Sequence, residues 1–101
     1  MTTNWTAQLR NITQRIAQPP ETIDEAVVRL IAILDDEQKL ILAAMPEDDL
    51  IDLHFSLGSA IRNAFGLYNE KSKLLESCGK TNPDDVSGQI VYALWKHLRT
   101  L

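Results

Sequence analysis

Apolar residues recur at helical spacing along nearly the whole chain, and prolines divide this pattern into short segments. Near the beginning of the chain, apolar residues three or four positions apart form one face of a first predicted helix: Trp5, Leu9, Ile12 and Ile16. Pro19-Pro20 must end that helix, because neither residue can donate a hydrogen bond to the helix ladder. No segment alternates between apolar and polar residues for long, as a half-buried strand would. The spacing therefore predicts an all-helical protein built from short elements.

Capping signals define the boundaries of the other elements. Thr22 and Glu25 form a capping box, and Asn82-Pro83 places a cap directly before a proline in the first helical position. Met45-Pro46 interrupts the helical pattern, and Gly79 is a suitable left-handed residue at a helix end. We therefore predict helices over residues 5–16, 23–34, 35–44, 47–67, 71–78 and 83–98.

These elements predict the fold class. With short connections, neighbouring helices pack antiparallel around one core, so we expect an all-α fold, a single compact bundle of five or six helices, with residues 1–101 as a single helical domain. Gly58 in the middle of a helix indicates that another element approaches closely there. The sixth helix is expected to turn Ile90, Leu94 and His97 inward. The predicted core includes Leu30, Leu34, Leu50, Leu57, Ile61, Leu94 and Trp95.

Charge is distributed unevenly along the sequence. Residues 21–53 contain ten acidic residues against Arg29 and Lys39, a net charge of −8, whereas the whole chain carries −4. The segments on either side of this third carry +2 each. A pI near 5.0 argues against direct nucleic-acid binding, which requires a basic face. The acidic third is therefore where we expect a partner to bind.

The acidic clusters allow two interpretations. Each one lies at a predicted helix start, where a carboxylate accepts hydrogen bonds from backbone amides and interacts favourably with the helix dipole. Metal binding is the alternative, but no calcium-loop spacing is present, so we expect no metal site. Helix starts do not account for all the acids between residues 35 and 52. The predicted partner-binding residues are Asp35, Asp36, Glu37, Glu47, Asp48, Asp49 and Asp52.

The sequence gives little support for an enzyme or for a cofactor. His54 falls on an apolar stripe, as a core or boundary histidine would, and His97 lies near a helix end. Cys78 is the single cysteine; a thiol paired with a histidine is conceivable, but an inert thiol fits its position better. Arg62 and Asn63 could belong to a binding site, but an ion pair for Arg62 and a turn cap for Asn63 explain them better. We expect no catalytic residues and no cofactor.

The second half of the chain resembles a small bacterial family of helical proteins. The shared pattern is an acidic helix start, His-Phe, a glycine, then Ile-Arg-Asn-x-Phe-Gly-Leu-aromatic; here it covers 48–58 and 61–68. Leu74-Leu75, Cys78-Gly79, Pro83-Asp84-Asp85 and Leu94-Trp95 extend the resemblance to residues 47–98. The chain departs from the pattern at residues 68–70, where the family has tryptophan and a glycine-containing turn. The resemblance implies an all-helical bacterial protein and implies no reaction.

Small acidic helical proteins of this kind also resemble immunity proteins, which neutralise secreted bacterial toxins. A nuclease toxin has a basic active site because it binds phosphates, and an acidic surface can oppose that charge. We therefore expect an immunity protein that binds a basic protein toxin of the nuclease class. The alternative is a non-enzymatic regulatory or adaptor module that binds a partner helix, and a small enzyme using His54 or Arg62 is a distant third. No signal peptide or apolar span is visible, so a cytoplasmic location without membrane contact is expected.

Overall fold

The structure is a computed structural model that describes residues 19–69, 71–79 and 82–100. The fold is an all-α bundle, as predicted, and the first predicted helix lies outside the described residues. The elements are α2 (Ile23–Ile33), α3 (Asp36–Ala44), the 3₁₀ segment η1 (Glu47–Leu53), the π-helical segment η2 (His54–Gly58), α4 (Ser59–Ala64), α5 (Lys73–Ser77) and α6 (Pro83–Arg99).

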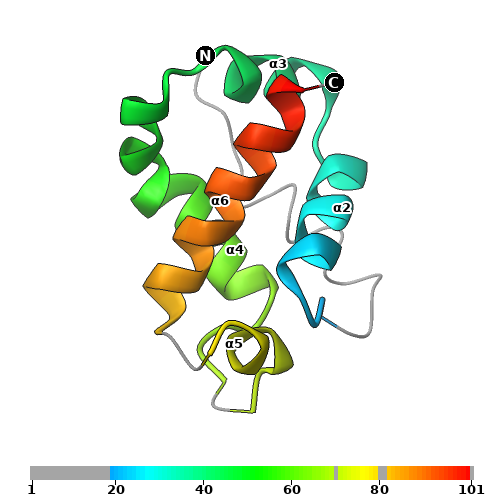
Figure 1. Ribbon diagram of the computed structural model, residues 1–101, viewed down its shortest axis with the longest axis vertical. Coiled ribbons are helices and arrows are strands. Elements are labelled where there is room, and N and C mark those ends of the chain that lie inside the picture. Colours follow the sequence, from blue (N-terminus) through cyan, green and yellow to red (C-terminus); the bar gives the residue numbers. More distant parts are fainter. Residues whose placement is uncertain (1–18, 70, 80–81, 101) are drawn as a thin grey trace.

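Helix α6 occupies the centre of the bundle (Figure 1). It packs against α2, α3, η1, η2 and α4. In Figure 1, α2 lies to one side of α6, η1 and η2 lie to the other, and α4 passes behind it. Helix α3 lies across the end of the bundle where α6 finishes, and α5 lies at the opposite end (Figure 1). All other described elements except α5 therefore make substantial contact with α6.

The predicted capping residues lie at the helix ends, but the Thr22–Glu25 capping box forms only in part, because the Glu25 carboxylate accepts a hydrogen bond from the backbone N–H of Glu21 at 2.8 Å. The Thr22 side chain accepts a hydrogen bond from the backbone N–H of Glu25 at 3.1 Å. The Asn82 side chain accepts one from the N–H of Asp85 at 2.9 Å, directly before Pro83 begins α6. Gly79 has a φ of +79°, the left-handed conformation that glycine adopts without strain after a helix end. Local sequence thus determines these boundaries.

Six of the seven predicted core residues are buried: Leu30, Leu34, Leu57, Ile61, Leu94 and Trp95. Leu50 is only half-buried. His97 was expected on the inner side of α6 but is exposed, and Tyr68, directly after the predicted helix over 47–67, is 61% exposed. Tyr68 lies beyond the end of α4, so the helical spacing no longer applies to it.

The prediction of one regular helix over 47–67 is wrong. The segment begins as 3₁₀, continues as a π-helical turn and becomes α-helical only at Ser59, and α4 ends at Ala64. Arg62 Nη2 donates to the backbone carbonyl of His54 at 3.1 Å. A side chain thus hydrogen-bonds to the backbone at the start of the π-helical turn, where the helix is wider. The change of winding brings Leu53 inward and leaves Leu50 at the boundary.

Gly58 is a close contact point, as predicted, and the atoms nearest to it belong to two side chains and one backbone carbonyl. A Cβ at this position would lie 3.2 Å from Arg62 Nη1 and 3.8 Å from Ser87 Oγ of α6. It would also lie 3.3 Å from the carbonyl oxygen of Leu53, one turn earlier. A side chain here would crowd these atoms, so Arg62 or the Leu53 carbonyl would have to shift by a few tenths of an ångström to admit one.

Candidate partner-binding surface

All seven predicted partner-binding acids are exposed. Asp35 is the N-cap of α3, where its carboxylate accepts from the N–H of Gln38 at 2.8 Å and the Gln38 side chain accepts from the N–H of Asp35 at 3.2 Å. Asp36 and Glu37 occupy the first turn of α3. The other four acids, Glu47, Asp48, Asp49 and Asp52, all belong to η1.

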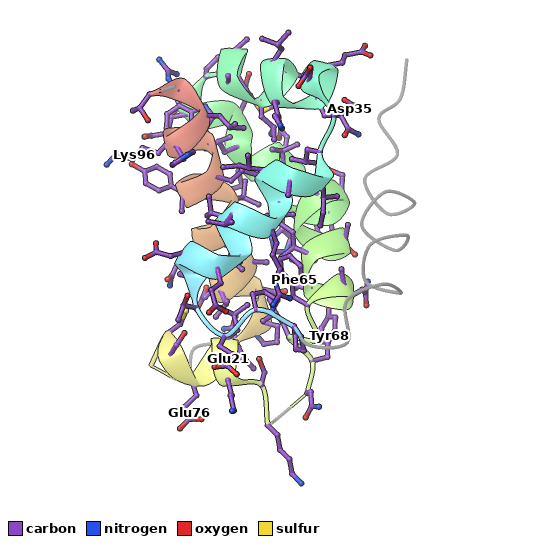
Figure 2. The ribbon with its side chains drawn as sticks, turned by 90° about the vertical axis from the view of Figure 1, so that its right-hand side faces the viewer. Glu21, Asp35, Phe65, Tyr68, Glu76 and Lys96 are labelled. Atoms are coloured by element: carbon purple, nitrogen blue, oxygen red, sulfur yellow. The ribbon has the colours of Figure 1, made fainter. Side chains whose placement is uncertain are left out.

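The acids form two groups that flank α3. One group begins this nine-residue helix and the other follows its end, so the helix length of roughly 13 Å separates them. Both groups lie at the end of the bundle that α3 covers (Figure 1). Figure 2 shows Asp35 at this end, at the turn that precedes α3. Whether one partner contacts both groups stays a prediction.

The capping interpretation is confirmed for Asp35. Asp35 binds a backbone amide, whereas η1 has no side-chain cap. Within the described part of the chain, the six other carboxylates form no ion pair with a basic side chain; these are Asp36, Glu37, Glu47, Asp48, Asp49 and Asp52. Their negative charge is therefore directed to solvent.

A pocket of about 310 Å³ lies between η1, η2 and α6. Its lining combines apolar side chains with a few polar groups: Glu47, Leu50, Ile51, His54, Gly58, Ser87, Gly88, Val91 and Tyr92. This volume is near the lower limit for small-molecule sites, so it suits one or two side chains better than a cofactor.

Exposed apolar side chains lie on the same segment as the acids. Ile51 is 78% exposed and lines the pocket, and Phe55 is 88% exposed. The Phe55 ring meets the His54 ring edge-on, with centroids 4.8 Å apart. Large apolar side chains that alternate with acids on one surface are typical of a protein-binding site.

The sequence analysis did not identify Ile51, Phe55 or the pocket. A signal was present, because Ile51 lies three residues after Asp48, and Phe55 lies three residues after Asp52 and four after Ile51. Ile51 and Phe55 therefore stand on an acidic helical face rather than on the apolar one.

Behind the pocket lies the buried guanidinium of Arg62, which is 4% exposed. Its Nη1 donates to Ser87 Oγ at 2.8 Å and its Nε to the Tyr68 hydroxyl at 3.0 Å. Nε also lies 3.4 Å from a carboxylate oxygen of Asp84. Arg62 therefore connects α4 with the start of α6, which supports the ion-pair interpretation of this residue.

The other candidate residues do not assemble into a catalytic arrangement. His54 is half-buried and His97 exposed, and the Cys78 sulfur lies 3.8 Å from the hydroxyl of neighbouring Ser77. Asn63 donates to the carbonyl of Ser59 on the exposed side of α4. In the described ranges, no three His, Cys, Asp or Glu residues are grouped so as to hold a metal ion.

Comparison with known proteins gives one match. No curated protein and no solved structure matches the chain. Among the helices that the structure describes, none is long and apolar enough to cross a bilayer. The sequence pattern of a domain of unknown function, DUF6794, matches residues 19–98, which include every helix described above. This match covers most of the sequence, and the chain belongs to the DUF6794 family.

Proposed function

We propose that this protein binds a basic protein partner through its exposed acids, and that the partner is a bacterial toxin of the nuclease class that it neutralises as an immunity protein. One observation carries the proposal: six exposed carboxylates flank α3 and form no ion pair within the described part of the chain. Such a surface attracts a protein whose own site is basic.

The expected contribution of these charges is mainly kinetic. An exposed ion pair stabilises a complex by only about 0–1 kcal/mol. Several like charges at one end of a molecule nevertheless produce a potential that steers a basic partner, and steered association can reach about 10⁸–10⁹ M⁻¹s⁻¹ at low salt. The acids should therefore affect the association rate more than the dissociation rate.

The second candidate function is a regulatory or adaptor module that binds a partner helix. The pocket between η1, η2 and α6 favours it, because a partner helix could place a side chain there. The two candidates differ in what the partner does after binding, since only a toxin loses an activity.

The test uses a partner encoded next to this gene or captured with the full-length protein. The variant carries Asp36→Lys, Asp49→Lys and Asp52→Lys, three exposed acids from the two groups. We expect association with the partner to be at least about tenfold slower at low salt and to lose most of its salt dependence. A toxin partner should also be inhibited less by this variant.

A matched control carries Asp24→Lys, Glu76→Lys and Asp85→Lys. These side chains are also exposed, and the net charge changes by the same amount. Asp24 and Asp85 belong to the first turns of α2 and α6, which begin toward the end of the bundle where α5 is found, and Figure 2 labels Glu76 at that end. If the two variants bind alike, or if the first binds like the parent protein, the acidic surface is not the binding site.

A further inference from the structure

The apolar wall of the pocket offers little to a charged ligand. Leu50, Ile51, Val91 and Tyr92 contribute this wall from η1 and α6. Leu50 is half-buried, Val91 is 5% exposed and Ile51 remains 78% exposed, so an apolar group that entered would remove further apolar surface from water.

The floor of the pocket disfavours a cation. Gly58 and Ser87 line it, and both lie against Arg62 Nη1, as the short distances given above show. The carboxylate of Asp84 approaches the guanidinium at Nε rather than at Nη1. A lysine or arginine head placed on this floor would therefore approach a positive charge without an intervening carboxylate.

The segment η1, which contributes one side of the pocket, has the opposite charge. Glu47 lines the pocket, and Asp48, Asp49 and Asp52 belong to the same short segment. Because these carboxylates have no basic partner within the described ranges, cationic side chains are favoured around the pocket and disfavoured inside it.

We infer that the pocket between η1, η2 and α6 holds one uncharged apolar side chain, of the size of leucine, from a helix of the basic partner. Lysine or arginine residues on either side of this anchor then face the acids of η1. The inference rests on the proposed function, which supplies the positive charge of the partner. It adds the kind of side chain that the partner inserts and the pocket that receives this side chain.

Gly88 offers a way to block the pocket without disturbing the core. It lines the pocket on α6, and a Cβ there would meet no other atom within 4 Å. Gly88→Leu should therefore fold and fill part of the pocket, whereas Gly88→Ala adds only a methyl group. Circular dichroism and thermal unfolding of both variants verify that they fold.

The probes are three blocked, 15-residue helical peptides built on alanine and glutamine. One carries four lysines and a central leucine, the second has alanine in place of the leucine, and the third has glutamine in place of the lysines but keeps the leucine. Binding is measured by fluorescence anisotropy at low salt with the full-length protein. We expect the lysine–leucine peptide to bind about tenfold more tightly than the lysine–alanine peptide, because the buried leucine removes additional apolar surface from water.

The variants separate the two proposals. Gly88→Leu should abolish the preference for leucine and Gly88→Ala should retain it, whereas the triple charge-reversed variant should weaken both lysine peptides by the same factor. Equal binding of the two lysine peptides by the parent protein would overturn the pocket assignment and leave the acidic surface standing. If the glutamine–leucine peptide binds as tightly as the lysine–leucine peptide, the acids do not contribute to binding, and the pocket assignment is retained. Absence of binding by all three peptides at millimolar concentration overturns both.

Discussion

Arg62 on α4 and Ser87 on α6 are joined by a hydrogen bond of 2.8 Å in the interior of the bundle. Ser87 in turn donates to the carbonyl of Asp84 at 3.0 Å, and the Asp84 carboxylate lies 3.4 Å from Arg62 Nε. The three residues form a closed ring of polar contacts that fixes the first turn of α6 against α4. A charged group is thus satisfied where most neighbouring side chains are apolar.

Replacing Arg62 should destabilise the fold. Arg62→Met keeps much of the length of the side chain but leaves the Ser87 hydroxyl and the His54 carbonyl without their donor, so we expect a loss of roughly 2–4 kcal/mol in the free energy of unfolding. Urea denaturation measures it. Asn63→Ala, on the exposed side of the same helix, is the control and should change stability by less than about 1 kcal/mol. Similar losses of stability in the two variants would show that the ring of polar contacts around Arg62 does not stabilise the fold.

Substitutions at Gly58 and Gly88 should change the stability of the protein in opposite directions. Gly58→Leu should cost roughly 1–3 kcal/mol, because its Cβ alone would already crowd Arg62 Nη1 and the Leu53 carbonyl. Gly88→Ala should stabilise the protein by up to about 1 kcal/mol, since it adds helix propensity in open space. Thermal unfolding of both variants gives the comparison, and a stable Gly58→Leu variant would contradict the packing described here.

Leu57→Ala should cost roughly 2–5 kcal/mol, because Leu57 is fully buried between η2 and the rest of the core and the substitution leaves a cavity. Leu40→Ala removes the same atoms from a side chain that is 70% exposed and should have little effect. Chemical denaturation of the pair tests the register of η2. A loss below about 1 kcal/mol for Leu57→Ala would place this residue at the surface.

Trp95 provides the fourth test. Its indole Nε1 donates to the carbonyl of Met45 at 2.7 Å, which fastens α6 to the turn between α3 and η1. Trp95→Phe keeps an aromatic ring but removes the donor, so we expect a loss of roughly 1–3 kcal/mol. Tyr92→Phe, one turn away and 43% exposed, is the control. Equal stability of Trp95→Phe and the parent protein would show that solvent replaces the bond without cost.

Local signals were sufficient to predict much of the fold. The side chains of Thr22 and Asn82 cap their helices from within a few residues, and Gly79 ends α5 through its own backbone conformation. The apolar spacing in α6 identified Leu94 and Trp95 as buried because that helix is regular over its length.

The irregular segment could not be predicted in the same way. Apolar spacings of three and four fit 3₁₀ and α-helical winding alike. The sequence pattern therefore does not show whether Leu50 or Leu53 is the buried residue. The burial of Arg62 depends on Ser87 and Asp84, which follow it by more than twenty residues. Only the tertiary packing of α6 brings these groups together, and a charged residue taken alone is expected at the surface. The pocket depends on the same packing.

The central position of α6 has a consequence for biosynthesis. Among the described elements this helix is the last to be made, yet it contacts α2, α3, η1, η2 and α4. Because so many of the contacts between elements involve α6, the apolar core cannot be completed until this helix has been translated. Loss of this helix through a premature stop codon would therefore leave a chain that chaperones and proteases recognise as unfolded.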